Sequence, residues 1–179
     1  MDIRLSSPDD ESLIRGVHEA AFGPEQGPVI ADLAIALLYD PTAQPLLSLF
    51  SCGGDRPTGH VLFTRVRVGP DAVPGQILAP LAVLPQLQKQ GIGTRLVEHG
   101  LELLREEGCR LVFVLGDPAY YGRFGFQPAG RLGFEAPYPI PDEHADAWMV
   151  LELAEGTLGR VRGAVHCANA LNDPQHWIE

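Results

Sequence analysis

Cysteine is scarce in this 179-residue chain, and its three copies, Cys52, Cys109 and Cys167, lie far apart. An odd number of separated cysteines argues against a disulfide framework and favours a reducing compartment. Long apolar runs are also missing, since no uninterrupted stretch approaches the length that spans a bilayer. The N-terminal residues MDIRLSSPDDES lack the basic and apolar regions of a signal peptide. We therefore expect a soluble, cytoplasmic protein that does not enter a membrane.

Positive charge is in short supply. The chain carries 13 lysines and arginines against 23 aspartates and glutamates, which gives a formal net charge of −10. Most of such a surface repels a polyanion, so nucleic-acid binding is disfavoured. The same surface attracts small amines and basic peptides.

The remaining composition is that of an ordinary globular protein, with 45% hydrophobic and 20% charged residues. No repeat, low-complexity run or linker divides the chain, so we predict a single domain over residues 1–179. The tail over residues 155–179 is ambiguous, and we assign no element to it.

Helical spacing dominates the first forty residues, after a short strand at Ile3 and Leu5. Ser7 can cap a helix whose first position suits Pro8. Apolar residues then recur at helical spacing at Leu13, Ile14, Val17 and Ala21. A second helix is predicted from Val29 to Leu38, and Asp40-Pro41 ends it.

Strand-forming residues follow. Residues 46–51 and 59–68 flank a glycine-bearing turn and predict a hairpin, and residues 77–84 predict another strand. Pro80 interrupts that strand and implies a bulge, a bend or an unpaired side, because proline cannot donate to a ladder.

The clearest helix is predicted from Gly91 to Glu107, with apolar residues on one face and charged residues on the other. Residues 111–115 (LVFVL) form a fully apolar run typical of a central buried strand, which we expect to pair in parallel with an earlier strand. A short helix at Asp117-Pro118 and a strand over residues 148–153 complete the series. The sum is an α+β fold with a mixed, mostly antiparallel central sheet flanked by helices.

A glycine-bearing loop, Gln88-x-x-Gly91-x-Gly93, lies between a predicted strand and this helix. Bare backbone N–H groups at the positive end of a helix form a cradle for a phosphate or pyrophosphate, although two glycines can also serve only as a tight turn. The phosphate-binding lysine motif is missing, since Thr94-Arg95 follows Gly93. The dinucleotide fingerprint is missing too, because its third glycine is replaced by Leu96.

Two stretches together resemble the GNAT superfamily of N-acetyltransferases. The loop Gln88-Lys89-Gln90-Gly91-Ile92-Gly93 is similar to its acetyl-CoA pyrophosphate loop, and the preceding Leu81-Ala82-Val83 to its cofactor strand. The stretch Gly116-Asp117-Pro118-Ala119-Tyr120-Tyr121 is similar to a later helix of the family, in a bacterial and largely uncharacterised branch. The resemblance extends over residues 1 to about 153.

The resemblance implies acetyl-CoA as co-substrate, an amine acceptor and no metal. Backbone groups of Leu81 and Val83 are expected to hold the pantetheine arm, where the sheet splays between this strand and residues 111–115. The full set of expected cofactor-binding residues is Leu81, Ala82, Val83, Gln88, Lys89, Gln90, Gly91, Ile92, Gly93, Thr94, Tyr120 and Phe124.

The implied reaction is the attack of an amine on a thioester, with a backbone N–H near Leu81 or Ala82 stabilising the oxyanion. Tyr121 matches the family position that protonates the leaving thiolate. Many family members use a glutamate of the cofactor strand as base, but residues 77–83 carry no acid. Asp117, His60 and a water chain stay open as bases. Asp117 is also expected to cap its helix, and His60 to lie at a strand edge.

The main alternative is a catalytically silent module that senses acyl-CoA. The acceptor pocket is expected to come from the first two helices and the loop near residues 133–147, and a homodimer is possible. His166, Cys167 and His176 lack the spacing of metal ligands. The acidic loop over residues 142–146 is expected to be solvated.

Overall fold

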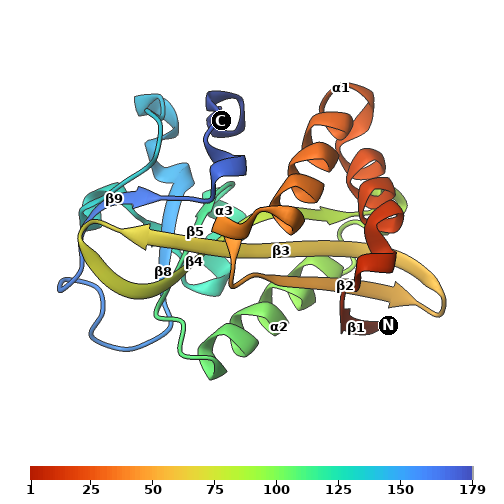
Figure 1. The fold of residues 1–179 in the computed structure, drawn as a ribbon, viewed down its shortest axis with the longest axis horizontal. Helices are drawn as coiled ribbons and strands as arrows, with labels where there is room; N and C mark the ends of the chain where they lie inside the picture. The colour runs from red at the N-terminus through yellow and green to blue at the C-terminus, as the bar shows by residue number, and fades with distance from the viewer. Residues whose placement is uncertain (179) are drawn as a thin grey trace.

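A nine-stranded sheet crosses the whole protein in the computed structural model, which describes residues 1–178 apart from the side chains of Asp71 and Ala72 (Figure 1). Its main path runs in the order β1-β2-β3-β4-β5-β8-β6, with β9 pairing with both β3 and β7. The strands are β1 Asp2–Leu5, β2 Leu47–Gly53, β3 Arg56–Val68, β4 Asp71–Val83, β5 Leu111–Leu115, β6 Gln127–Pro128, β7 Phe134–Glu135, β8 Trp148–Glu152 and β9 Gly163–His166. The helices are α1 Glu11–Tyr39, α2 Ile92–Glu106 and α3 Pro118–Tyr121.

Most strand pairs are antiparallel, and the parallel ones are β4 with β5 and β7 with β9. The parallel pair β4 and β5 brackets α2, as predicted from the apolar run at residues 111–115. That run is almost entirely buried and lies between β4 and β8. The predicted α+β class with a mixed, mostly antiparallel sheet is therefore confirmed.

The helices cover the two faces of the sheet. Figure 1 shows α2 beneath the sheet, and α1 with the C-terminal segment above it. Leu96, Val97, Leu101 and Leu104 of α2 are buried on the sheet. Gly100 allows the close approach, because a Cβ at that position would overlap the ring of Phe63.

The two predicted N-terminal helices form one element, α1, which is broken at Gly23. Gly23 has φ +81° and ψ −178°, values that interrupt helical geometry, and Pro24 restarts the helix on the far side. Asp40 ends α1, as expected from Asp40-Pro41. Before α1, Ser7 takes part in a capping box at the short 3₁₀ turn Pro8–Asp10.

The strand β4 carries the irregularity expected at Pro80. Val61 of β3 pairs with Leu81, but Phe63 pairs with Leu78, so two β4 residues lie opposite one β3 residue. On its other side, β4 pairs with β5 only from Gly75 to Ile77. Beyond Ile77 the two strands separate, which confirms the expected splay of the sheet.

The ambiguous tail is well integrated into the fold over its described residues. Strand β9 pairs Arg67 and Val68 of β3 with His166 and Val165. Near the end, the indole of Trp177 is 2% exposed and donates a hydrogen bond to the carbonyl of Leu171. Within residues 1–178, no helix is long and apolar enough to cross a membrane.

Candidate active site

The glycine loop and the start of α2 border an open cavity of about 500 Å³. Gly91 adopts φ +87° at the N-cap of α2, a conformation that glycine accepts without strain. Lys89 also has a positive φ, of 64°, which is uncommon for a residue with a side chain. These two residues turn the loop so that it leads directly into the helix N-terminus, where unpaired backbone N–H groups favour an anion.

Most of the expected cofactor-binding residues lie together around this cavity. Its lining contains Leu81, Val83, Gln88, Lys89, Gly91, Ile92, Gly93, Thr94 and Tyr120, together with Leu87 and Arg123. Three expected residues lie outside this lining. Ala82 is buried against Phe50 on the α1 side, Gln90 is exposed beside the loop, and the Phe124 ring packs 5.5 Å from that of Tyr120.

Arg123 is a cavity residue that the sequence analysis missed. Its guanidinium stacks 4.6 Å from the centre of the Tyr120 ring, and Nη2 lies 3.4 Å from Thr94 Oγ1. Arg123 therefore links α3 to the first turn of α2 across the cavity. Together with Lys89 it places two cations around the loop of a chain whose net charge is −10.

A second cavity, of about 570 Å³, opens where β4 and β5 separate. Its lining includes residues 78–81 of β4, Val114 and Leu115 of β5, and Gly116 just after β5, and Tyr121 lines it from α3. Leu81 borders both cavities, so the β4 edge connects the loop cavity to the one at Tyr121. An elongated ligand that follows β4 would reach from one cavity into the other.

The Tyr121 ring is held by neighbouring aromatic rings. It is 9% exposed, and its centre lies 5.0 Å from that of Tyr120 and 5.7 Å from that of Phe126. Gly116 leaves room for it, because a Cβ there would overlap the Tyr121 ring. The two consecutive tyrosines thus serve different cavities, Tyr120 at the loop and Tyr121 at the splay.

The candidate bases differ sharply in position. Asp117 caps α3, as expected, since Oδ1 accepts the Ala119 N–H at 2.9 Å, and it also lines the cavity at the splay. His60 is not at a strand edge, because β3 lies between β2 and β4. It is also outside the described linings of both cavities.

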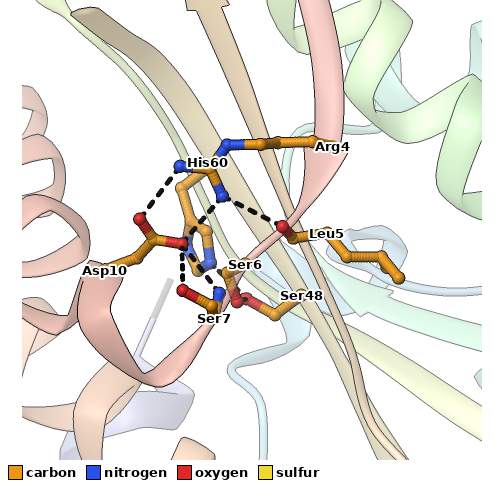
Figure 2. Close-up of polar contacts among 7 residues, drawn as sticks. All are labelled: Arg4, Leu5, Ser6, Ser7, Asp10, Ser48 and His60. Carbon is orange, nitrogen blue, oxygen red and sulfur yellow. Dashed lines mark hydrogen bonds and ion pairs between the residues drawn. The ribbon is translucent and has the colours of Figure 1, made fainter. Parts of the chain in front are cut away.

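His60 instead belongs to a buried polar chain on the α1 side of the sheet. Its Nδ1 lies 2.8 Å from His18 Nε2, and its Nε2 lies 2.8 Å from Ser48 Oγ, which accepts a hydrogen bond from Ser6. Figure 2 shows His60 and Ser48 beside the ion pair of Arg4 and Asp10. Burial lowers the pKa of His18 to about 4, and burial together with His18 holds the pKa of His60 well below its usual value. These histidines are therefore neutral core residues.

The C-terminal tail, not the loop near residues 133–147, forms the outer wall of the cavity at the splay. Leu171 and residues 175–178 line it opposite residues of α1, whereas residues 133–147, all of them described, contribute nothing to this lining. Of the segments expected at an acceptor pocket, α1 borders this cavity and residues 133–147 do not. The packing of Trp177 on Trp148, with ring centres 5.7 Å apart, and the hydrogen bonds of the Asn169 and Ala170 N–H groups to Thr42 and Asp40 hold the tail at this place.

The acidic loop is solvated, as expected. The 3₁₀ helix Asp142–Ala147 is exposed except at Ala147, and Asp146 in it pairs with Arg131 at 3.0 Å. Within residues 1–178, no three metal-ligating side chains of the His, Cys, Asp or Glu type come together. The three cysteines are free thiols, and burial raises the pKa of Cys109 to about 11 and that of Cys167 to about 12.

Comparison with known proteins decides the family. A family model described as an acetyltransferase (GNAT) domain matches residues 55–128, which include β3, β4, the glycine loop and both tyrosines. The chain is 44% identical over 168 residues to the uncharacterized N-acetyltransferase YjhQ of Escherichia coli K12. This alignment covers 92% of this chain and 91% of YjhQ. The chain belongs to the GNAT family of acetyltransferases.

Solved GNAT structures share its fold over nearly their whole length. Escherichia coli YhbS in complex with CoA aligns with a TM-score of 0.86 at 31% identity, over 96% of this chain and 92% of that one. A Brucella melitensis family member in complex with acetyl-CoA aligns with a TM-score of 0.75 at 30% identity, over 94% and 96% of the two chains. The resemblance seen in the two sequence motifs is thereby confirmed as family membership.

Proposed function

We propose that this GNAT protein transfers an acetyl group from acetyl-CoA to a primary amine at the splay between β4 and β5. The observation that carries the proposal is that both cavities border Leu81 on the same edge of β4. A cofactor laid across Leu81 has its phosphates at the glycine loop and its thioester beside Tyr121. The CoA and acetyl-CoA complexes of the two aligned relatives support this choice of cofactor.

The donor side uses backbone more than side chains. Beyond Ile77, no strand of the described chain pairs with the β5-facing edge of β4, so its backbone groups are available to the pantetheine amides. Backbone N–H groups from Lys89 to Thr94 would hold the pyrophosphate at the positive end of α2. Lys89 and Arg123 would add charge to this site. Gln88, Ile92 and Tyr120 line the same cavity and would enclose the cofactor, whereas Ala82, Gln90 and Phe124 would support the residues that touch it.

The chemistry follows from what stands at the thioester. The amine nitrogen attacks the carbonyl carbon, a C–N bond forms, and the C–S bond breaks as a thiolate leaves. A backbone N–H of β4 near Leu81 would stabilise the oxyanion, and the Tyr121 hydroxyl would give the thiolate its proton. The amine loses its own proton to Asp117 or His176, which both line this cavity.

Release of free CoA thiol from acetyl-CoA, measured with a panel of amines, tests the proposal. Lys89 is the chain's only lysine, so self-acetylation can involve little beyond this residue and the N-terminal amine. The pH dependence of kcat/KM identifies the base. A limb below pH 6.5 indicates His176, whose pKa burial lowers from its usual value, and a profile without that limb argues against His176.

A catalytically silent acyl-CoA sensor is the second candidate, favoured by the lack of an acid on β4. Tight acetyl-CoA binding without thiol release for any amine would favour the sensor and end the transferase proposal. We further propose that residues 1–179 act as one domain in the cytoplasm, a reducing compartment in which free thiols persist. We also propose that this domain can form a homodimer.

A further inference from the structure

The cavity at the splay has a wall that the donor half of the reaction does not explain. One side is the second segment of α1, which begins at Pro24 after the break at Gly23. The opposite side is the C-terminal tail around Trp177. Both sides lie outside residues 55–128, which match the family model: α1 precedes them and the tail follows them. We therefore assign this wall to the acceptor molecule that reacts with the thioester, not to the cofactor loop.

The wall carries apolar side chains that are partly exposed to solvent. Val29 of α1 is 38% exposed and Ile178 of the tail is 77% exposed, although both border the cavity. Phe22, Ile30 and Trp177 extend the same apolar lining inward. Exposed apolar surface that gathers around a concave site marks a place where a ligand covers it.

The charges on the cavity are all of one sign. Glu25, at the first turn of the second α1 segment, and Asp117 at the start of α3 both line it. No lysine or arginine occurs in this lining of described residues, whereas the loop cavity has Lys89 and Arg123. The titratable groups that face these carboxylates are Tyr121 and His176. Burial lowers the pKa of His176 from its usual value. The site thus favours a cation and repels an anion.

We infer that this cavity accepts a small primary amine with an apolar body and without a carboxylate or phosphate group. The inference rests on the proposed function and narrows its acceptor. The ammonium is attracted by Glu25 and Asp117, and the apolar body covers Val29 and Ile178. The volume of about 570 Å³, which the acyl end of the cofactor must share, suits a small molecule.

A matched set of amines tests this acceptor class. We would measure kcat/KM by thiol release with 2-phenylethylamine, with phenylalanine, which adds a carboxylate, and with ethanolamine, which lacks the apolar body. We expect 2-phenylethylamine to exceed each of the other two by about tenfold or more. Equal or better use of phenylalanine overturns the charge argument, and equal use of ethanolamine overturns the apolar one. Preference for an N-terminal peptide amine over all three overturns the small-molecule assignment.

Charge variants locate the source of the selectivity. Glu25→Gln together with Asp117→Asn should lower the preference for 2-phenylethylamine over phenylalanine by about tenfold. Asn at position 117 can still accept the Ala119 N–H and so keeps the α3 cap. The control is Glu143→Gln, which removes one exposed carboxylate in the 142–147 turn and should leave the preference unchanged. An unchanged preference in the double variant contradicts the inference.

Binding measurements separate this inference from the proposed function. Calorimetry on the CoA-saturated protein gives the affinity for 2-phenylethylamine and phenylalanine without any turnover. Tighter binding of 2-phenylethylamine with no thiol release would support the acceptor class and refute the transferase. Thiol release that is faster with acidic amines would support the transferase and refute the acceptor class.

Discussion

At the scale of single residues, two neighbouring tyrosines divide the site between them. Tyr120 lines the loop cavity, and the Arg123 guanidinium stacks on its ring, whereas Tyr121 lines the cavity at the splay. Consecutive residues on a short helix point in different directions, which explains how one dipeptide serves both halves of the site. The hydroxyl of Tyr121, not its ring, is the part that the proposed chemistry requires.

Tyr121→Phe should lower kcat by about 10²-fold or more, because the general acid is removed while the ring contacts with Tyr120 and Phe126 stay. The acetyl-CoA affinity, measured by calorimetry, should change little, since the hydroxyl acts only as the thiolate leaves. Tyr138→Phe, at a partly buried position that lines neither cavity, serves as the control. A wild-type kcat in Tyr121→Phe would remove this residue from the mechanism.

At the scale of elements, the site depends on a strand that changes partners and a loop that follows it. The bulge at Pro80 coincides with the end of β4–β5 pairing, so β4 is free to bind a ligand where it approaches the glycine loop. The loop then needs a left-handed residue at Gly91 to enter α2. A Cβ at Gly91 would meet no protein atom within 4 Å, so a side chain there would extend into the open space of the loop cavity.

Gly91→Val should weaken acetyl-CoA binding by about tenfold or more, because valine resists φ +87° and crowds the cavity. Gly108→Val is a matched control beyond the other end of α2, with φ +88° and equally open space around its Cβ. Both variants should lose about 1–2 kcal/mol of unfolding free energy, measured with urea. Only Gly91→Val should lose cofactor affinity, and equal affinities would place the pyrophosphate elsewhere.

At the scale of the whole molecule, the two faces of the sheet have different roles. The α2 face holds the apolar cluster that supports Tyr121, with Phe63, Leu96 and Phe126 among its members. The α1 face carries the buried chain of His18, His60 and Ser48. Neutral histidines in a core make the stability of the entire fold depend on pH, since burial disfavours their charged form.

The unfolding free energy should fall as the pH drops below about 6.5, the ordinary pKa of histidine. Below pH 6.5 the histidines of the unfolded chain are protonated, whereas His18 in the folded protein stays neutral until the pH approaches its pKa of about 4. This difference corresponds to about 3 kcal/mol lost from His18 across the window, and His60, whose pKa is also lowered, adds to the loss over the same pH range. Urea unfolding from pH 7.5 to pH 4 measures it.

His18→Gln should flatten this pH dependence, because the position no longer titrates, whatever the variant's stability at neutral pH. His99→Gln on the exposed face of α2 is the control and should keep the wild-type slope. An identical slope in His18→Gln and the wild type would mean that the acid loss arises elsewhere, for example at Asp10, whose ion pair with Arg4 lowers its pKa to about 2.

The sequence by itself determined the α+β class and the long helices, and it predicted the residues of the donor half of the site. These features rest on local signals: the apolar spacing of α2, the buried run of β5, Pro80, and the glycines that open a helix. Each acts through backbone geometry within a few residues, so it can be identified without distant contacts. The two separate motifs predict one site together because the fold places Arg123, just after α3, beside Thr94 at the start of α2.

Only the tertiary structure decided the position of Arg123, the burial of His60 and the wall made by the tail. His60 looked like a strand-edge residue because sequence alone does not show which strands flank β3. The tail has little periodicity of its own, and its place depends on Trp177 packing on Trp148, almost thirty residues earlier. Contacts between distant segments arise from packing of the complete chain, which is why the cavity wall made by α1 and the tail became visible only in the folded molecule.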